Sequence, residues 1–114
     1  MAKKPSLIPP PGQGGGLMEK LGQMQTEMKR VQAELAEERM TISVGGDAVQ
    51  IVIDGQVRVH HVQVAPEALA AAQSDTQLLE DLLTSAMNIA IERAQTLGAE
   101  RLRGLSSGLG LPEL

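Results

Sequence analysis

The side chains best suited to chemistry in this chain are its only two histidines, the adjacent pair His60 and His61. An imidazole can bind a metal ion or transfer a proton near neutral pH. Neighbouring side chains of a regular strand point to opposite faces, however, so one small site could not readily use both. No third ligand stands at a recognisable spacing, and the chain has no cysteine. We therefore expect ordinary strand residues here, with no metal and no cofactor, and a metal-dependent enzyme remains only an alternative.

Two glycine-containing stretches also fail as catalytic motifs. The glycines at 14–16 are followed by no Gly-Lys-Ser/Thr and preceded by no strand pattern, so they do not form a phosphate loop. They predict a hinge ahead of a helix instead. The sequence SSG at 106–108 lacks the strand-to-helix setting of a nucleophile elbow. We expect a protein that is not an enzyme and has no small-molecule substrate.

The remaining chemistry is electrostatic, because the 114-residue chain distributes its charges unevenly. The net charge is −4, yet residues 1–30 carry +3, residues 31–92 carry −8 and residues 93–114 carry +1. Basic ends around an acidic middle make phosphate contact a candidate role for Lys20, Lys29 and Arg30. The alternative is that each is solvated or paired with a nearby glutamate. The absence of Phe, Tyr and Trp argues against binding single strands by base stacking.

The segment that positions these three bases reads as a long helix over residues 17–39. Its apolar residues recur at intervals of four and three, which is a heptad seam. A helix of this length spans roughly 35 Å, more than a three-stranded sheet alone is expected to cover. We therefore expect part of the seam to form a subunit interface, with packing entirely on the chain's own sheet as the alternative. The predicted interface residues are Leu21, Met24, Met28 and Val31.

The middle of the chain changes to the period of a strand. We predict strands over residues 41–44, 49–54 and 57–64, with a turn at 45–47 and a hairpin turn at Asp54-Gly55. Valines of the third strand switch parity at His60-His61. Either both faces are covered there, or a β-bulge absorbs one residue and restores the face. We favour the bulge.

Two further helices follow the strands. Pro66 opens a short helix over 66–72, and Ser74 with Gln77 predicts a capping box for a long last helix. Arg93 falls inside the apolar stripe of that helix, so its charge needs a partner or an exit to solvent.

Together these elements predict one α+β domain at 17–105. Residues 1–16 carry four of the six prolines and four glycines, which indicates a flexible arm, and residues 106–114 read as a tail. The start has no apolar segment typical of a signal peptide, and no run is long enough to cross a bilayer. We expect a cytoplasmic protein without a membrane partner.

The order of these elements and several motifs resemble the YbaB/EbfC family of bacterial nucleoid-associated proteins. The matching stretches are GGGLMEKLGQMQTEM, VQIVIDGQVRVHHVQVAPEAL, LLEDLLTSAMNIAIERA and LSSGLGLP, within about residues 14–112. The resemblance implies a homodimer of joined three-stranded antiparallel sheets, with the first and last long helices projecting like the jaws of tweezers. It also implies association with the nucleoid and binding of double-stranded DNA with little sequence preference.

The resemblance also suggests which basic residues of the protein contact DNA. Lys20 of the first helix and Arg93 and Arg101 of the last match the family best, and Lys29, Arg30 and Arg103 lie close to them in sequence. We expect these bases to contact the DNA backbone, because the chain has charge but no base-reading motif. The alternative is a protein-interaction adaptor that uses the exposed helical seam and the proline-rich arm.

Overall fold

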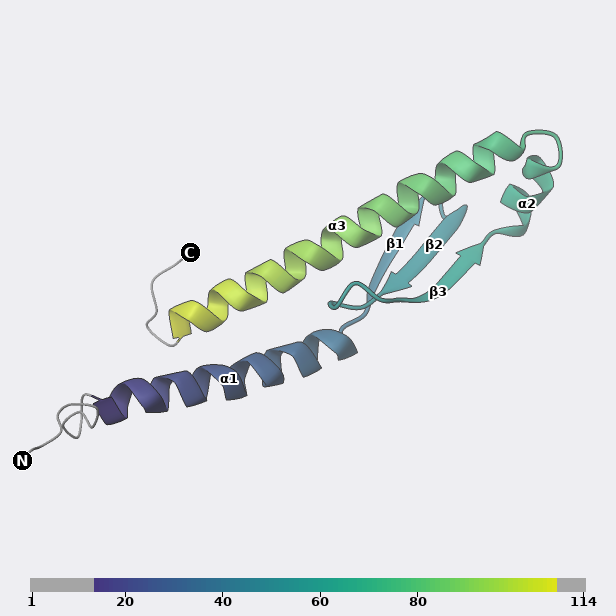
Figure 1. Ribbon diagram of the computed structural model, residues 1–114. Helices are drawn as coiled ribbons and strands as arrows, with labels where there is room; N and C mark the ends of the chain where they lie inside the picture. Colours follow the sequence, from purple (N-terminus) through teal and green to yellow (C-terminus); the bar gives the residue numbers. More distant parts are fainter. Residues whose placement is uncertain (1–13, 109–114) are drawn as a thin grey trace, which may run out of the picture.

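The computed structural model describes residues 14–108 as a helix, three strands and two further helices (Figure 1). This order confirms the predicted α+β fold, with a long first helix, an antiparallel sheet, a short helix and a long last helix. No helix in this range is long and apolar enough to cross a membrane. The bounds are α1 (Gly14–Glu37), β1 (Met40–Val44), β2 (Val49–Ile53), β3 (Val59–Val64), α2 (Pro66–Ala72) and α3 (Thr76–Gly108).

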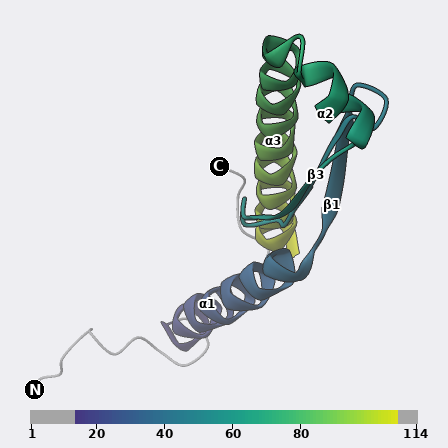
Figure 2. The same ribbon diagram turned by 90° about the vertical axis from the view of Figure 1, so that its right-hand side faces the viewer.

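The core lies between one face of the sheet and α3. The sheet is antiparallel in the order β1-β2-β3, and α3 runs along one side of it (Figure 2). The sheet contributes Ile42, Val49, Ile51 and Ile53, and α3 contributes Ala86, Ala90 and Ala94; all seven are buried. Because alanines repeat every four residues along α3, this helix presents a smooth face that can pack closely on the sheet.

A β-bulge in β3 confirms the reading of the histidine pair. Val52 pairs with His61 but the next residue, Ile53, pairs with Val59, so His60 is the extra residue. The bulge keeps Val59 and Val62 on one face of the sheet, which is also the face of their pairing partners Ile53 and Ile51. Without it, one of these valines would turn to the other face.

The connection between β2 and β3 is longer than the predicted two-residue turn. Asp54 N–H donates to the Arg58 carbonyl at 2.9 Å, and Val57 adopts a positive φ of 64°, so the chain reverses over residues 54–58. For this reason β3 starts at Val59 and not at Val57. We call residues 54–58 the β2–β3 loop.

α1 is packed only near its C-terminal end. Val31 and Leu35 are buried, whereas Leu17 and Leu21 nearer the start are more than half exposed. Two hydrogen bonds tie α1 to the β2–β3 loop: Gly55 N–H donates to the Leu35 carbonyl at 2.8 Å, and Gln56 Nε2 donates to the Gln32 carbonyl at 2.8 Å. The rest of α1 extends away from the sheet (Figure 1).

Helix boundaries differ from the predictions at four places. α1 begins at Gly14, so the glycines predicted as a hinge are helical, and it ends at Glu37 instead of residue 39. α3 begins at Thr76 and is capped by Asp75, whose Oδ1 accepts the Leu78 N–H at 3.2 Å; the Ser74 hydroxyl donates to the Ala71 carbonyl instead. α3 continues to Gly108, three residues into the predicted tail. Residues 1–13 of the predicted arm and 109–114 of the tail lie outside the described residues.

The contact between Gly55 and Leu35 generates a first prediction. A Cβ at position 55 would lie 2.6 Å from Leu35 Cδ2 and 2.9 Å from the Leu35 carbonyl oxygen, so the Gly55→Ala variant must displace α1. We expect a loss of about 1–3 kcal/mol in the free energy of unfolding, measured by urea denaturation.

The matched control is Gly104→Ala in α3. A Cβ there would have no neighbour within 4 Å, so the only expected effect is a helix-propensity gain of about 0.5–1 kcal/mol. Equal stability of the Gly55→Ala variant and the wild type would contradict the tight joint.

Candidate nucleic-acid interface

The predicted DNA-contacting bases lie on the two long helices. Beyond the sheet, the N-terminal part of α1 and the C-terminal part of α3 extend in the same direction (Figure 1). α1 carries three of these bases and α3 the other three. They are Lys20, Lys29 and Arg30 in α1, and Arg93, Arg101 and Arg103 in α3.

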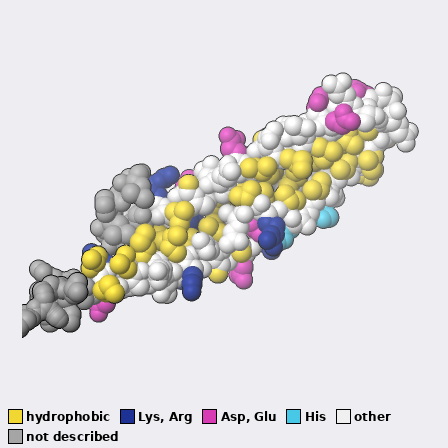
Figure 3. All heavy atoms as spheres, viewed as in Figure 1, with side chains coloured by type: hydrophobic (Ala, Val, Ile, Leu, Met, Phe, Trp, Pro, Cys, Tyr) yellow, Lys and Arg dark blue, Asp and Glu magenta, His cyan; other side chains and the backbone are white. Residues whose placement is uncertain are grey.

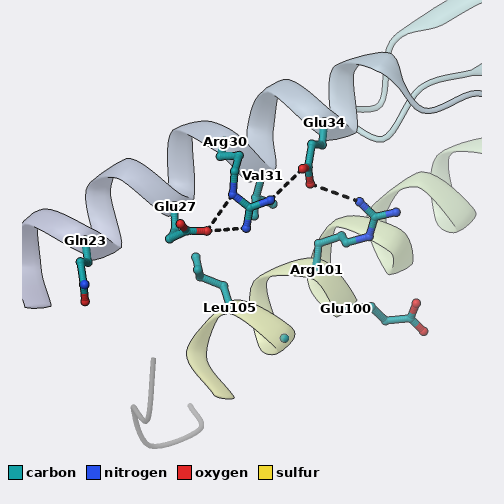
Figure 4. A pocket seen from close by; sticks show the side chains of 9 residues that line it. Gln23, Glu27, Arg30, Val31, Glu34, Glu100, Arg101 and Leu105 are labelled. Carbon is teal, nitrogen blue, oxygen red and sulfur yellow. Dashed lines mark hydrogen bonds and ion pairs between the residues drawn. The ribbon is translucent and has the colours of Figure 1, made fainter. Parts of the chain in front are cut away.

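Two of the six bases are held in a chain of ion pairs across the cleft between the helices (Figure 4). Arg101 Nη2 donates to Glu38 Oε2 at 2.8 Å, and Arg101 Nη1 lies 4.0 Å from Glu34 Oε1. The other oxygen of Glu34 accepts from Arg30 Nη1 at 2.7 Å, and Arg30 also pairs with Glu27. We call these five residues the ion-pair chain.

The ion-pair chain neutralises both of its arginines. It contains three carboxylates and two guanidinium groups, a formal charge of −1. The hydrogen bond that Arg101 donates to Glu38 raises the pKa of Arg101, and the one that Arg30 donates to Glu27 raises the pKa of Arg30. The alternative reading of Arg30, pairing with nearby glutamates, therefore describes its side chain in this structure.

The other four bases are exposed and lie outside the ion-pair chain. They are Lys20, Lys29, Arg93 and Arg103. Within residues 14–108, no ion pair involves any of them. Arg93, which the sequence places inside the apolar stripe of α3, reaches solvent beside Met40 and Leu97. These side chains can therefore meet an external anion without first breaking an ion pair inside the chain.

The cleft between α1 and α3 has a volume of about 590 Å³. The ion-pair chain supplies Glu27, Arg30, Glu34 and Arg101 to its lining. Val31 and Leu105 are buried and line the same cleft, one from each helix. An apolar contact thus accompanies the ionic one where the two helices approach each other.

The two histidines do not form a common site. His60 Nε2 lies 2.8 Å from Asp54 Oδ2, while His61 pairs opposite Val52, whose side chain faces away from the core. No group of three potential metal ligands converges within residues 14–108. His60 instead helps to order the β2–β3 loop.

Asp54 is a positioning residue that the sequence analysis treated only as part of a turn. Its side chain is 3% exposed and accepts hydrogen bonds from the backbone N–H groups of Gln56 and Arg58, at 2.8 and 3.1 Å. Burial opposes ionisation of this carboxyl, but the hydrogen bonds from His60 and the two amides lower its pKa below the ordinary value. Asp54 therefore orders the loop that holds α1.

The predicted dimer seam divides into a buried and an exposed part. Val31 is 5% exposed and is therefore packed inside its own chain. Leu21 is 51% exposed, and Met24 and Met28 are half-buried. A groove of about 720 Å³ on α1 is lined by these three side chains and by Lys29, among others. Three of the four predicted residues remain available for a subunit contact.

A second apolar surface lies on the body and was missed by the sequence analysis. Val59 and Val62 of β3 and Met87 and Ile91 of α3 are each 40–49% exposed. The valines share the face that packs on α3, but β3 is an edge strand beyond the reach of that helix. Figure 3 shows apolar side chains in a band along the body and again along α1. We call Val59, Val62, Met87 and Ile91 the β3–α3 surface.

The two helical residues of this surface lie on the flank of α3 that faces the β3 side. Ile91 and Gly98 are seven residues apart and therefore share a flank. A Cβ at Gly98 would lie 3.7 Å from the Gly55 carbonyl oxygen in the β2–β3 loop, which fixes the direction of that flank. The change in alternation of the valines at His60-His61 was the sequence signal for this surface. It can be interpreted only when the bulge and the position of α3 are known.

Comparison with known proteins gives the family. The sequence model of the YbaB/EbfC DNA-binding family matches residues 11–109, so this chain belongs to that family. It is similar to a protein of Clostridium novyi described as nucleoid-associated protein NT01CX_0824, with 33% identity over 107 residues, 90% of this chain and 92% of the relative.

A solved structure supports the fold. The crystal structure of the uncharacterized protein HP0035 from Helicobacter pylori superposes with a TM-score of 0.65 at 19% identity. The match covers 82% of this chain and 92% of that one. The likeness therefore extends over most of both chains.

The lowered pKa of Asp54 generates a prediction about stability and pH. A carboxyl whose folded pKa is depressed stabilises the fold above its ordinary pKa, and this contribution is lost as the pH falls through the folded value. At neutral pH we expect Asp54→Asn to lose about 1–3 kcal/mol of unfolding free energy, since a neutral amide replaces the buried carboxylate that accepts these hydrogen bonds. Below about pH 4 the difference from wild type should shrink.

The measurement is urea denaturation of both proteins between neutral and acidic pH. Asp47→Asn is the matched control, because Asp47 is exposed and hydrogen-bonds only to the Ser43 hydroxyl among the described residues. We expect the control to stay within about 0.5 kcal/mol of the wild type. A pH-independent gap for Asp54→Asn would mean that the ionised carboxylate is not what orders the loop.

Proposed function

We propose that this protein binds duplex DNA as a homodimer through the phosphate backbone, and that it organises or protects the bacterial nucleoid and affects gene expression. The observation that carries the proposal is the set of four exposed bases on the two long helices of a chain in a DNA-binding family. The name of the Clostridium novyi relative supports the association with the nucleoid.

The distribution of charge supports backbone contact. The four exposed bases are Lys20 and Lys29 of α1 and Arg93 and Arg103 of α3, and two of them lie near the free helix ends. Acidic side chains gather at the opposite end of the molecule, around α2 and the start of α3 (Figure 3). A duplex therefore meets attraction at one end and repulsion at the other. Phosphate contacts of this kind fix position on DNA without reading its sequence.

Exposed apolar surface supports the dimer. The β3–α3 surface presents two valines, a methionine and an isoleucine to solvent beside an unpaired edge strand. The α1 seam adds Leu21, Met24 and Met28. Burying both surfaces against a second copy would enlarge a core that contains no aromatic residue. A dimer would also double the number of basic side chains that can contact one duplex.

DNA binding is predicted to fall steeply with salt. If the four exposed bases of each chain contact phosphates, a dimer makes eight contacts, and affinity should drop about 10⁴-fold between 50 and 200 mM salt. Gel-shift titrations over this range of salt, with duplexes of different sequence, measure both the salt dependence and the sequence preference of binding. Tight binding that is indifferent to salt would contradict the phosphate contacts, and a strong sequence preference would contradict backbone recognition.

Charge reversal identifies the contacting bases. Lys20→Glu removes two contacts per dimer, so the slope of log affinity against log salt should become shallower by about 1.8. Arg93→Glu and Arg103→Glu should act in the same way. The control is Arg58→Glu in the β2–β3 loop, which makes the same charge change at a residue that belongs to neither helix. Equal effects of the control and the three variants would remove these sites.

The dimer surface is testable by a pair of substitutions in β3. Val62→Asp places a charge on the β3–α3 surface, whereas Gln63→Asp places it on the opposite face of the same strand. In sedimentation equilibrium we expect Val62→Asp to shift the dimer towards the monomer by tenfold or more, roughly 1.4 kcal/mol, and Gln63→Asp to leave it unchanged. Leu21→Asp tests the α1 seam in the same experiment. An unchanged mass for both Val62→Asp and Leu21→Asp would exclude these surfaces.

A further inference from the structure

The ion-pair chain contains two of the six bases that the sequence assigns to DNA contact, and it leaves neither guanidinium free. The pairs of Arg101 with Glu38 and Glu34 join residues 63 and 67 positions apart in the chain, so they depend on how α1 and α3 are arranged. Within the described residues, they are also the ion pairs that connect the α1 segment to α3. Arg101 is therefore both a potential phosphate ligand and the ionic link between the two helices.

We propose that Glu34 and Glu38 form an acidic latch that withholds Arg101 from DNA and is released when phosphate takes the place of the carboxylates. The proposal rests on the proposed DNA-binding function and concerns its regulation. Glu38 and Glu34 are four residues apart, and Arg101 reaches both. A phosphate oxygen offers the guanidinium the same charge and acceptor geometry as a carboxylate oxygen.

The energetics allow this exchange. Both carboxylates and both arginines are partly exposed, with side-chain exposures of 35–54%, so water screens the pairs. Exposed ion pairs of this kind contribute little to the stability of a fold. The buried side chains of Val31 and Leu105 and the bond between Gly55 and Leu35 do not depend on the latch, and they keep α1 in place when it opens.

The latch also changes how strongly the affinity for DNA depends on the salt concentration. A free arginine that contacts DNA releases a condensed counterion from the duplex. An arginine that must leave Glu38 exposes a carboxylate, which recruits a cation and offsets that release. The wild type should therefore show a weaker salt dependence than a protein whose Arg101 is already free.

The test compares Glu38→Gln with Glu37→Gln. Both variants remove one negative charge from adjacent positions, but Glu37 is exposed and, among the described residues, takes part in no ion pair. In gel-shift titrations we expect Glu38→Gln to raise DNA affinity about two- to fivefold above Glu37→Gln. Its slope against log salt should steepen by up to about 1.8 per dimer, since two arginines are freed.

Adding Arg101→Gln separates release of Arg101 from a general loss of negative charge. We expect Arg101→Gln to cost more affinity in the Glu38→Gln background than in the wild type, because there Glu38 no longer pairs with the guanidinium. Thermal melts followed by circular dichroism establish that each variant is folded. Glu34→Gln is the second variant, to be used if Glu38→Gln does not fold.

The outcomes distinguish this proposal from the proposed function. If the wild type binds DNA with steep salt dependence but Glu38→Gln matches Glu37→Gln in affinity and slope, the latch is wrong and the DNA-binding function stands. A loss of affinity in Glu38→Gln would likewise overturn the latch, since the pair would then be needed to orient Arg101. Absence of DNA binding in the wild type and in Glu38→Gln alike would overturn both.

Discussion

The β2–β3 loop sets the direction of α1, because α1 is packed only near its C-terminal end. The Gly55 amide donates to the Leu35 carbonyl at a separation that leaves no room for a Cβ. Asp54 lies behind this contact and holds the loop with two backbone hydrogen bonds and one from His60. The bulge that brings His60 into the hydrogen-bonding distance of Asp54 also keeps the valines of β3 on the inner face. One short loop thus connects the sheet to α1, the helix that carries half of the candidate DNA contacts.

A core without aromatic residues explains why so much apolar surface remains exposed. α3 packs on the sheet through Ala86, Ala90 and Ala94, and small side chains allow close approach but cover little area. The helix reaches β1 and β2, and β3 with its valines stays at an open edge. Residues 14–108 accordingly form an elongated structure (Figure 1). A second copy of the chain is a chemically suitable cover for these surfaces.

Local patterns in the sequence predicted the elements well, because each depends on residues close together in the chain. The heptad spacing from Leu17 to Leu35 predicted α1, and the parity change at His60-His61 predicted the bulge. Competition between neighbours was harder to predict: Asp75 caps α3 although Ser74 has the better motif. Contacts between distant segments left no local signal. Neither the pairing of Glu38 with Arg101 nor the burial of Val31 under α3 follows from residue spacing, because both require the angle at which α1 leaves the sheet.

The basic side chains of the two long helices connect this architecture to the proposed DNA binding. Four bases are exposed on the two long helices, and two more are held by carboxylates in the cleft between them. The central claim is that two chains present these bases together to one duplex. Light scattering on the protein with and without a short duplex tests it most directly. The account predicts about 24 kDa for the free protein, twice the chain mass of 12.1 kDa, and a complex of one dimer with one duplex that dissociates at high salt. A mass of about 12 kDa that does not change when duplex is added at low salt would contradict it.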